Sequence, residues 1–407
     1  MSAYTRSESE RRIAGLQQLM KDAGLDGCLV TQNVGIYYLA GSMQTGYLFV
    51  PAKGPAAYYV KRSLKRAEDE SHVRVVELGS LRRFGGQLEG DYPALFAGNG
   101  SAGRPQIGAD LDVMPAQQYL RFVEAVPQAD WRDASALLRR QRSVKSEYEI
   151  GRIEAAARVA AASLEEGLRS LREGMTELEL MTVIERKMRE AGHIGLMRMR
   201  GYNQEIAAGM VAAGESAAVP TYFDGPAGGA GLTPAFPQSS SLRPIRRGEP
   251  ILLDIGCCID GYVIDQTRTA AIGRLPDELR RAYGTADAIL RRTEASLKPG
   301  AVPEALYVQA LSMAEDAGLS EHFMGFGRDQ VKFLGHGIGL EIDEWPVLAR
   351  GFTEPLEPGM VIAVEPKFTF PGAGVVGIEN TYLLTENGCR ALTLSPETLY
   401  EMPLDHP

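Results

Sequence analysis

Apolar residues in the first part of the chain alternate between helical and extended spacing. Across residues 11–24 they fall on one stripe at helical spacing, which predicts an amphipathic helix. Short apolar runs predict strands at 27–30, 46–50 and 56–60, and a further helix is predicted near 63–70. Because strand and helix alternate, the pattern predicts a small α/β domain.

A longer helical pattern begins at Ser146, where the type of structure changes. Ser146 and Glu149 have the spacing of a capping box, in which each residue satisfies a free backbone N–H of the other. We therefore predict a domain boundary at 140–146, which divides the chain into domains 1–143 and 144–407.

The second part of the chain contains an internal repetition. A long helix, a glycine, a shorter helix and a second glycine occur twice with the same spacing. The paired glycines are Gly174 with Gly192 and Gly300 with Gly318. This predicts an internal pseudo-two-fold duplication, with chance recurrence of a common pattern as the alternative.

Strand patterns also occur in the second part, so that we expect an α+β domain there. They cover 250–259, 262–272, 359–368 and 375–385. The stretch 220–244 is rich in Gly, Pro and Ser and predicts a long loop. Loops of that length in a compact domain are usually functional or mobile.

The composition indicates the class of protein and the cellular compartment. With 407 residues, 44% of them hydrophobic and 23% charged, the chain is typical of a soluble two-domain protein. A net charge of −9 argues against a nucleic-acid or anionic-membrane partner, which would require a basic face. No apolar run is long enough to span a membrane, and the polar N-terminus does not resemble a signal peptide. The four cysteines lack CxxC spacing, so we expect a reduced, cytoplasmic setting.

The strongest chemical signal lies in the hairpin predicted around Asp260-Gly261, a type I′ turn sequence. A two-residue loop there pairs Asp265 with Gly256 and Asp254 with Thr267, so both carboxylates project from one face as a diagonal pair. Like charges at that separation are costly unless a cation or a proton lies between them. Two acids on a solvated face are the alternative, but the surrounding residues are largely apolar. The pair therefore favours metal ligation.

His336 lies between Gly335 and Gly337 in a chain that has five histidines. A single histidine is more often a packed core residue than a ligand. Glycines on both sides allow backbone or substrate to approach the imidazole closely, which makes a ligand role a reasonable hypothesis.

Glu365 and Glu379 lie on apolar strand patterns that flank a Pro-Gly-Ala-Gly turn. A three-residue loop or an equivalent bulge would set them opposite each other on one face, whereas a four-residue loop would not. Pro366 removes a backbone donor directly after Glu365. Their use as ligands therefore requires an irregular offset in this hairpin.

Together these residues form a hard, oxygen-rich set of four carboxylates and one imidazole. Such a set suits Mn²⁺, Fe²⁺, Co²⁺ or Zn²⁺. We predict two divalent ions, Mn²⁺ first among them, held about 3.5–4 Å apart by bridging carboxylates. The predicted ligands are Asp254, Asp265, His336, Glu365 and Glu379.

In this order and context, the five residues resemble the metal site of the M24 "pita-bread" metallopeptidases. The N-terminal part resembles the creatinase/prolidase N-terminal domain in Gly24-Leu-Asp-Gly-Cys-Leu-Val and Ile36-Tyr-Tyr-Leu-Ala-Gly. The resemblance implies an α/β N-terminal domain followed by an α+β pita-bread catalytic domain. It also implies a homodimer.

The family resemblance further implies an Xaa-Pro dipeptidase or Xaa-Pro aminopeptidase that acts on small peptides. A metal-bridging hydroxide would attack the substrate carbonyl, and Glu365 would be the catalytic residue that accepts and passes on the proton.

Two positions depart from the peptidase pattern and leave alternatives open. Histidines that contact substrate in the family are replaced by Thr221, which precedes Tyr222, and by Asp343. We place these three residues in the substrate pocket. The departures allow a second hypothesis, a metal-dependent hydrolase or lyase of a small non-peptide metabolite. A third, a non-catalytic binding module, is disfavoured because all five ligand positions are filled.

Overall fold

The computed structural model describes residues 4–97 and 103–404 and divides into two compact units, Met1–Arg142 and Ser143–Pro407. Each unit has its own buried core of apolar side chains. Among the described residues, no helix combines the length and apolarity needed to cross a membrane.

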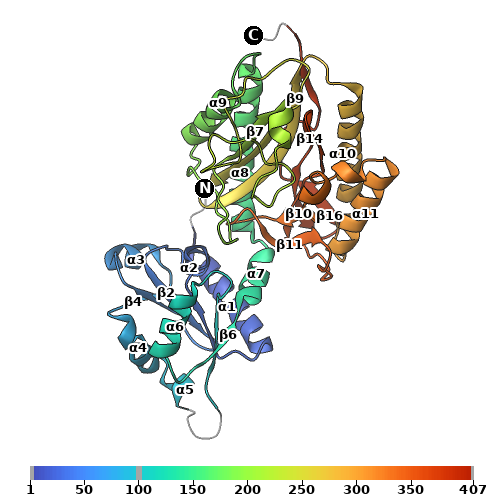
Figure 1. Ribbon diagram of the computed structural model, residues 1–407. Coiled ribbons are helices and arrows are strands. Elements are labelled where there is room, and N and C mark those ends of the chain that lie inside the picture. The colour runs from blue at the N-terminus through green and yellow to red at the C-terminus, as the bar shows by residue number, and fades with distance from the viewer. Residues whose placement is uncertain (1–3, 98–102, 405–407) are drawn as a thin grey trace. The chain divides into compact units, whose positions relative to one another are not determined.

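The first unit is an α/β structure built on one six-stranded sheet, with strand order β4-β3-β2-β1-β5-β6 (Figure 1). The central strand β1 pairs antiparallel with β2 and parallel with β5. Its elements are α1 (Arg6–Asp22), β1 (Gly27–Val30), α2 (Asn33–Ala40), β2 (Gly46–Pro51), β3 (Ala57–Val60), α3 (Leu64–Glu70), β4 (Arg74–Glu77), η1 (Leu81–Arg83), α4 (Phe84–Asp91), α5 (Pro93–Phe96), β5 (Gln106–Ala109), α6 (Ala116–Ala125), β6 (Asp130–Asp133) and α7 (Ser135–Ser143).

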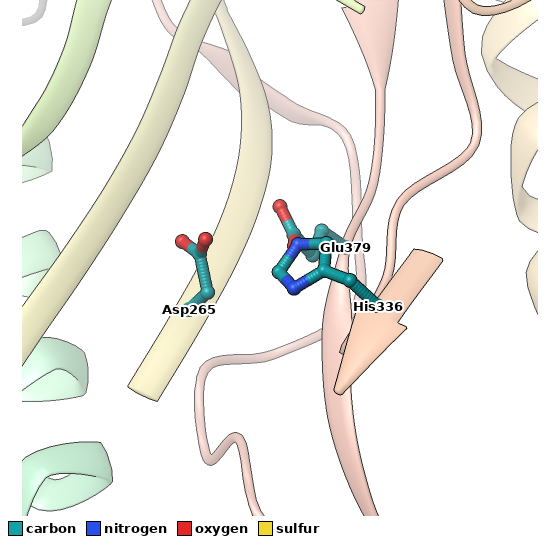
Figure 2. A group of neighbouring side chains, drawn as sticks. All are labelled: Asp265, His336 and Glu379. Carbon is teal, nitrogen blue, oxygen red and sulfur yellow. The ribbon is translucent and has the colours of Figure 1, made fainter. Parts of the chain in front are cut away.

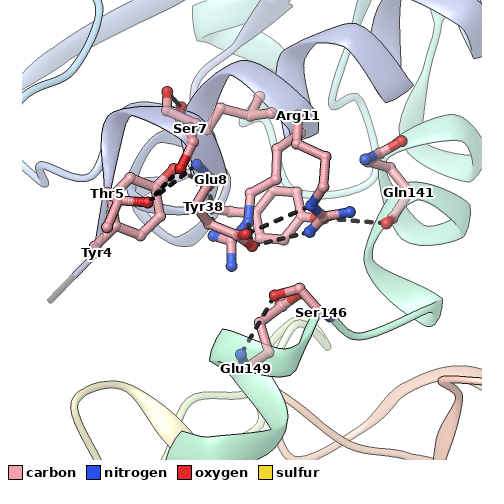
Figure 3. A network of polar contacts seen from close by, with 12 residues as sticks. Tyr4, Thr5, Ser7, Glu8, Arg11, Tyr38, Gln141, Ser146 and Glu149 are labelled. Carbon is pink, nitrogen blue, oxygen red and sulfur yellow. Dashed lines mark hydrogen bonds and ion pairs between the residues drawn. The ribbon is translucent and has the colours of Figure 1, made fainter. Parts of the chain in front are cut away.

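The first helix begins earlier than the prediction for 11–24. Thr5 is its N-cap, and the Thr5 hydroxyl accepts a hydrogen bond from the backbone N–H of Glu8 at 3.2 Å (Figure 3). This cap extends the helix through a polar turn that carries no apolar stripe, so hydrophobic spacing alone could not locate its start.

The second unit repeats one arrangement, a helical hairpin packed against an antiparallel sheet. Helices α8 and α9 lie beside β7–β9, and α10 and α11 lie beside the sheet that contains β10 (Figure 1). The glycines predicted to end the hairpin helices, Gly192 and Gly318, have positive φ of 102° and 71°, and so do Gly174 and Gly300 between the helices of each hairpin, at 80° and 85°. The predicted internal duplication is confirmed as part of the fold.

The elements of the second unit follow the predicted patterns, except that some predicted strands are each divided into two. They are α8 (Glu147–Ser170), α9 (Glu177–Glu190), β7 (Gly209–Ala213), η2 (Gly214–Ala218), β8 (Ile251–Ile259), β9 (Tyr262–Ile272), α10 (Asp277–Ser296), α11 (Pro303–Asp316), η3 (Ser320–His322), η4 (Gly327–Asp329), β10 (Phe333–Gly337), β11 (Glu344–Ala349), β12 (Val361–Val364), β13 (Lys367–Phe370), β14 (Gly374–Gly377), β15 (Asn380–Thr385), β16 (Gly388–Ala391) and β17 (Tyr400–Met402). Helix α8 starts with the predicted capping box of Ser146 and Glu149 (Figure 3). The stretch 220–244 contains neither helix nor strand, as predicted for a long loop.

The β8–β9 hairpin has the predicted register. Asp260 and Gly261 form the turn with φ of 51° and 89°. Gly256 lies opposite Asp265, and Asp254 lies opposite Thr267. The turn sequence therefore determined which face of the sheet carries both carboxylates.

The second hairpin contains the irregularity that Glu365 and Glu379 required. Phe370 pairs with Gly374, which leaves a three-residue loop at 371–373. Each strand predicted there is divided in two: 359–368 gives β12 and β13, and 375–385 gives β14 and β15. The register on both sides of the break is the same, with Val364 opposite Asn380 and Lys367 opposite Gly377, so the two glutamates face each other across the interruption.

We expect Gly335→Ala to lower the free energy of unfolding by about 2 kcal/mol, because overpacking a tight site typically costs 1–3 kcal/mol. A Cβ at Gly335 would lie 2.0 Å from the carbonyl oxygen of Ala363 on the neighbouring strand, and that backbone has little freedom to move. Gly284→Ala is the matched control. Gly284 lies on α10 with open space around it, and alanine there should stabilise the helix by about 0.5–1 kcal/mol. Urea unfolding of the three proteins gives the comparison, and equal midpoints for wild type and Gly335→Ala would contradict it.

Candidate metal centre

Five strand segments bring the predicted ligands to one place. Asp254 lies on β8, Asp265 on β9 and His336 on β10, while Glu365 follows β12 and Glu379 precedes β15. One ligand atom each from Asp265, His336 and Glu379 lie within 4.8 Å of one another, and all three residues are buried (Figure 2). Glu365 joins this group through His336, whose Nε2 lies 3.4 Å from Glu365 Oε1.

A lysine that the sequence analysis did not single out lies among these carboxylates. The ammonium of Lys367 donates hydrogen bonds to Glu365 Oε2 at 2.6 Å and to Glu379 Oε2 at 3.2 Å. It also lies 3.1 Å from Asp254 Oδ2. Lys367 is two residues after Glu365 on a buried segment, and this spacing places both side chains on one face. That was the sequence signal for its position.

Burial and mutual repulsion perturb the acids. Burial, with the charges of Glu379 and Asp254, raises the pKa of Asp265 well above its usual value. Burial also raises the pKa of Glu379, to about 7, although Lys367 opposes the shift. For Glu365 burial is outweighed by Lys367 and His336, which lower its pKa. Asp265 and Glu379 are therefore harder to ionise than Glu365.

The pKa values of Lys367 and His336 are both raised by the carboxylates around them. Burial alone would lower the pKa of the Lys367 ammonium, but Asp254, Glu365 and Glu379 outweigh it and raise that pKa well above its usual range. Burial likewise opposes ionisation of His336, yet Asp343 and Glu365 raise its pKa well above normal. The surrounding carboxylates thus stabilise positive charge within the site.

The orientation of His336 leaves one ring nitrogen for a ligand. Nδ1 lies 3.1 Å from the carbonyl oxygen of Gly337 and 3.4 Å from Asp343 Oδ1. Both are acceptors for a proton on Nδ1. A metal ion would take the Nε2 lone pair by displacing the proton that Glu365 favours there.

Two residues on β9 hold Glu379 in place. The hydroxyl of Thr267 donates to Glu379 Oε2 at 2.7 Å, and Arg268 Nη1 donates to the Glu379 carbonyl oxygen at 2.6 Å. Arg268 is fully buried, and its remaining N–H groups bind Thr267, Asn380, Ser395 and Pro396. Glu379 Oε1, by contrast, is buried and has no hydrogen-bond partner among the described residues. An orphaned carboxylate oxygen next to Asp265 and His336 is an arrangement that a divalent cation fits.

The centre opens onto a cavity of about 80 Å³. Asp254, Asp265, His336, Asp343 and Glu365 line it, together with apolar side chains that include Met197 and Phe236. Thr221 and Tyr222 instead line a neighbouring cavity of about 740 Å³. The two cavities share residues 223–228 of the long loop as a common wall. Of the three residues predicted for the substrate pocket, only Asp343 therefore borders the inner cavity.

Comparison with known proteins agrees with this architecture. The Creatinase/Prolidase N-terminal domain matches residues 12–144, and metallopeptidase family M24 matches residues 151–386. The chain is 25% identical to the Xaa-Pro dipeptidase of Pyrococcus horikoshii, over 95% of this chain and 98% of the relative. It is 29% identical to the probable dipeptidase PepE of Mycobacterium tuberculosis, over 97% and 96% of the two chains.

A solved structure shares the fold over nearly the whole length. The Xaa-Pro dipeptidase from Bacillus anthracis superposes with a TM-score of 0.80 at 26% identity, covering 97% of this chain and all of the other. Because the M24 match extends over more than half of the residues and contains all five converging side chains, the chain belongs to metallopeptidase family M24.

Proposed function

We propose that this chain is a metal-dependent peptidase that cleaves the bond before proline in small Xaa-Pro peptides. The observation that carries the proposal is the buried group of Asp265, His336 and Glu379 with its unpartnered Glu379 oxygen. The substrate class is supported by the relatives, several of which bear the name Xaa-Pro dipeptidase. These names also favour a peptide over the small non-peptide metabolite.

The residues present account for the parts of a hydrolytic site. A divalent ion, when bound, polarises a carbonyl oxygen and lowers the pKa of water. Glu365 borders the cavity next to His336, where its carboxylate can accept a proton from the attacking water and deliver it to the leaving amine. Met197 and Phe236 add an apolar part to the wall of the same cavity.

Several finer properties remain predictions. These are Mn²⁺ as the preferred ion, a homodimer and a cytoplasmic location. Asp343 and Thr221 bear on specificity, because they replace histidines that contact substrate in the family. Asp343 borders the cavity, and its Oδ1 lies 3.4 Å from Nδ1 of His336.

The substrate proposal predicts turnover of Xaa-Pro dipeptides or Xaa-Pro-Xaa tripeptides by protein loaded with Mn²⁺. The matching non-prolyl peptides should be cleaved far more slowly, and chelation should abolish activity because no carbonyl is then polarised. Chromatographic detection of released proline or of the shortened peptide is the measurement. A metal-loaded protein that cleaves none of these peptides would refute the proposed substrate.

The proton-transfer role predicts a large effect of Glu365→Gln, which keeps the shape of the side chain and removes its basicity. We expect kcat to fall by about 10²- to 10⁴-fold, the usual contribution of a general base. Metal content is measured in the same samples. Loss of the ion together with activity would assign Glu365 to binding instead of proton transfer.

The Asp343 carboxylate should strengthen metal binding by orienting His336. Removing a partner of this kind typically costs about 10- to 100-fold in metal affinity, which is the effect we expect for Asp343→Asn. Asp224→Asn is the control, because Asp224 is another carboxylate that lines the cavity. Titration with Mn²⁺ compares the two variants, and equal affinities would show that Asp343 has no special role.

A further inference from the structure

Lys367 contacts the residues that a pair of metal ions would require. Its ammonium is 1% exposed and lies 2.6–3.2 Å from carboxylate oxygens of Asp254, Glu365 and Glu379. Three of the five predicted ligands therefore already share one cation. An ammonium has three N–H groups and no acceptor, which matches three surrounding carboxylate oxygens.

The fold contains a dedicated slot for this side chain. Lys367 pairs with Gly377 across the β13–β14 ladder. A Cβ at Gly377 would lie 2.6 Å from Lys367 Cγ and 2.7 Å from the carbonyl oxygen of Pro366. Glycine at 377 thus provides the space through which the lysine stem reaches the carboxylates.

The Lys367 ammonium contacts Asp254, Glu365 and Glu379, and the other two predicted ligands lie outside these contacts. Asp265 and His336 are not among the residues that the ammonium contacts, and their ligand atoms converge with one from Glu379 (Figure 2). The two oxygens of Glu379 differ accordingly. Oε2 accepts from Thr267 and Lys367, whereas Oε1 has no partner among the described residues.

A second divalent ion would compete directly with the lysine. To reach Asp254 and Glu365 it would approach the oxygens that the ammonium contacts. The two cannot share those oxygens without displacement of Lys367.

We propose that the Lys367 ammonium takes the place of one of the two divalent ions predicted for this centre, so that the chain binds a single ion at Asp265, His336 and Glu379. The proposal rests on the metal dependence in the proposed function, but not on its substrate. Asp254 then acts as a partner of Lys367 and not as a metal ligand.

The first test is the number of Mn²⁺ ions bound by the full-length protein. We expect calorimetric titration and elemental analysis to give one Mn²⁺ per wild-type chain, and electron paramagnetic resonance to give the spectrum of an isolated ion. Lys367→Gly removes the ammonium and its stem and should bind two ions with a spin-coupled spectrum. Lys367→Arg, which keeps the charge, should retain one.

Two ligand variants keep the test decisive if the Lys367 variants fail to fold. Asp254→Asn should still bind one Mn²⁺, whereas Asp265→Asn should lose at least tenfold in affinity. Two coupled ions in the wild type, no bound ion, or loss of binding in Asp254→Asn would each overturn the proposal. A second ion that fails to bind folded Lys367→Gly would also overturn it.

The peptidase assay separates this proposal from the proposed function. One ion per chain without Xaa-Pro cleavage would refute the substrate and leave the single-ion centre standing. Xaa-Pro cleavage by a protein that holds two coupled ions would refute the single-ion centre and support the proposed substrate.

Discussion

The structure of the second unit depends on one constraint, the accumulation of negative charge in a buried space. Two unit charges 4 Å apart repel by about 4 kcal/mol even at an effective dielectric constant of 20. Asp254, Asp265, Glu365 and Glu379 all converge within the sheets, so cations and donors must be built around them. Lys367 and the Thr267 hydroxyl meet part of this demand, and the raised pKa values of Asp265 and Glu379 show that part of it remains.

The duplicated architecture supplies the rigidity that this arrangement requires. Each half presents a hairpin to the centre, and Arg268 ties the two together by binding backbone oxygens of Thr267 and Glu379. A guanidinium with all five N–H groups bonded has one available orientation, so Glu379 is held from its backbone as well as from its side chain. Ligand positions are thus set by strand register, which tolerates little variation.

Much of the fold and of the candidate site could be predicted from the sequence, because the interactions that determine them are local. The Asp260-Gly261 turn fixes the register of its hairpin, and with it the common face of Asp254 and Asp265. For the hairpin that carries Glu365 and Glu379, the sequence could state only which loop length would set them opposite each other. The observed three-residue loop at 371–373 depends on packing as well as on the turn residues. The early start of α1 was missed because a polar cap leaves no hydrophobic trace.

Lys367 was missed for a different reason. A lysine within an apolar strand acquires meaning only when its neighbours are known, and two of them, Asp254 and Glu379, come from other strands. The roles of Asp343, Thr221 and Tyr222 likewise depend on which cavity each residue borders, which no spacing rule provides.

Because Gly377 lies against the stem of Lys367, the identities of these two positions are coupled. Any larger residue at 377 would meet both the lysine stem and the carbonyl oxygen of Pro366. A side chain at 377 would therefore remove an internal counterion of Asp254, Glu365 and Glu379, and these acids would then depend on solution cations for their balance.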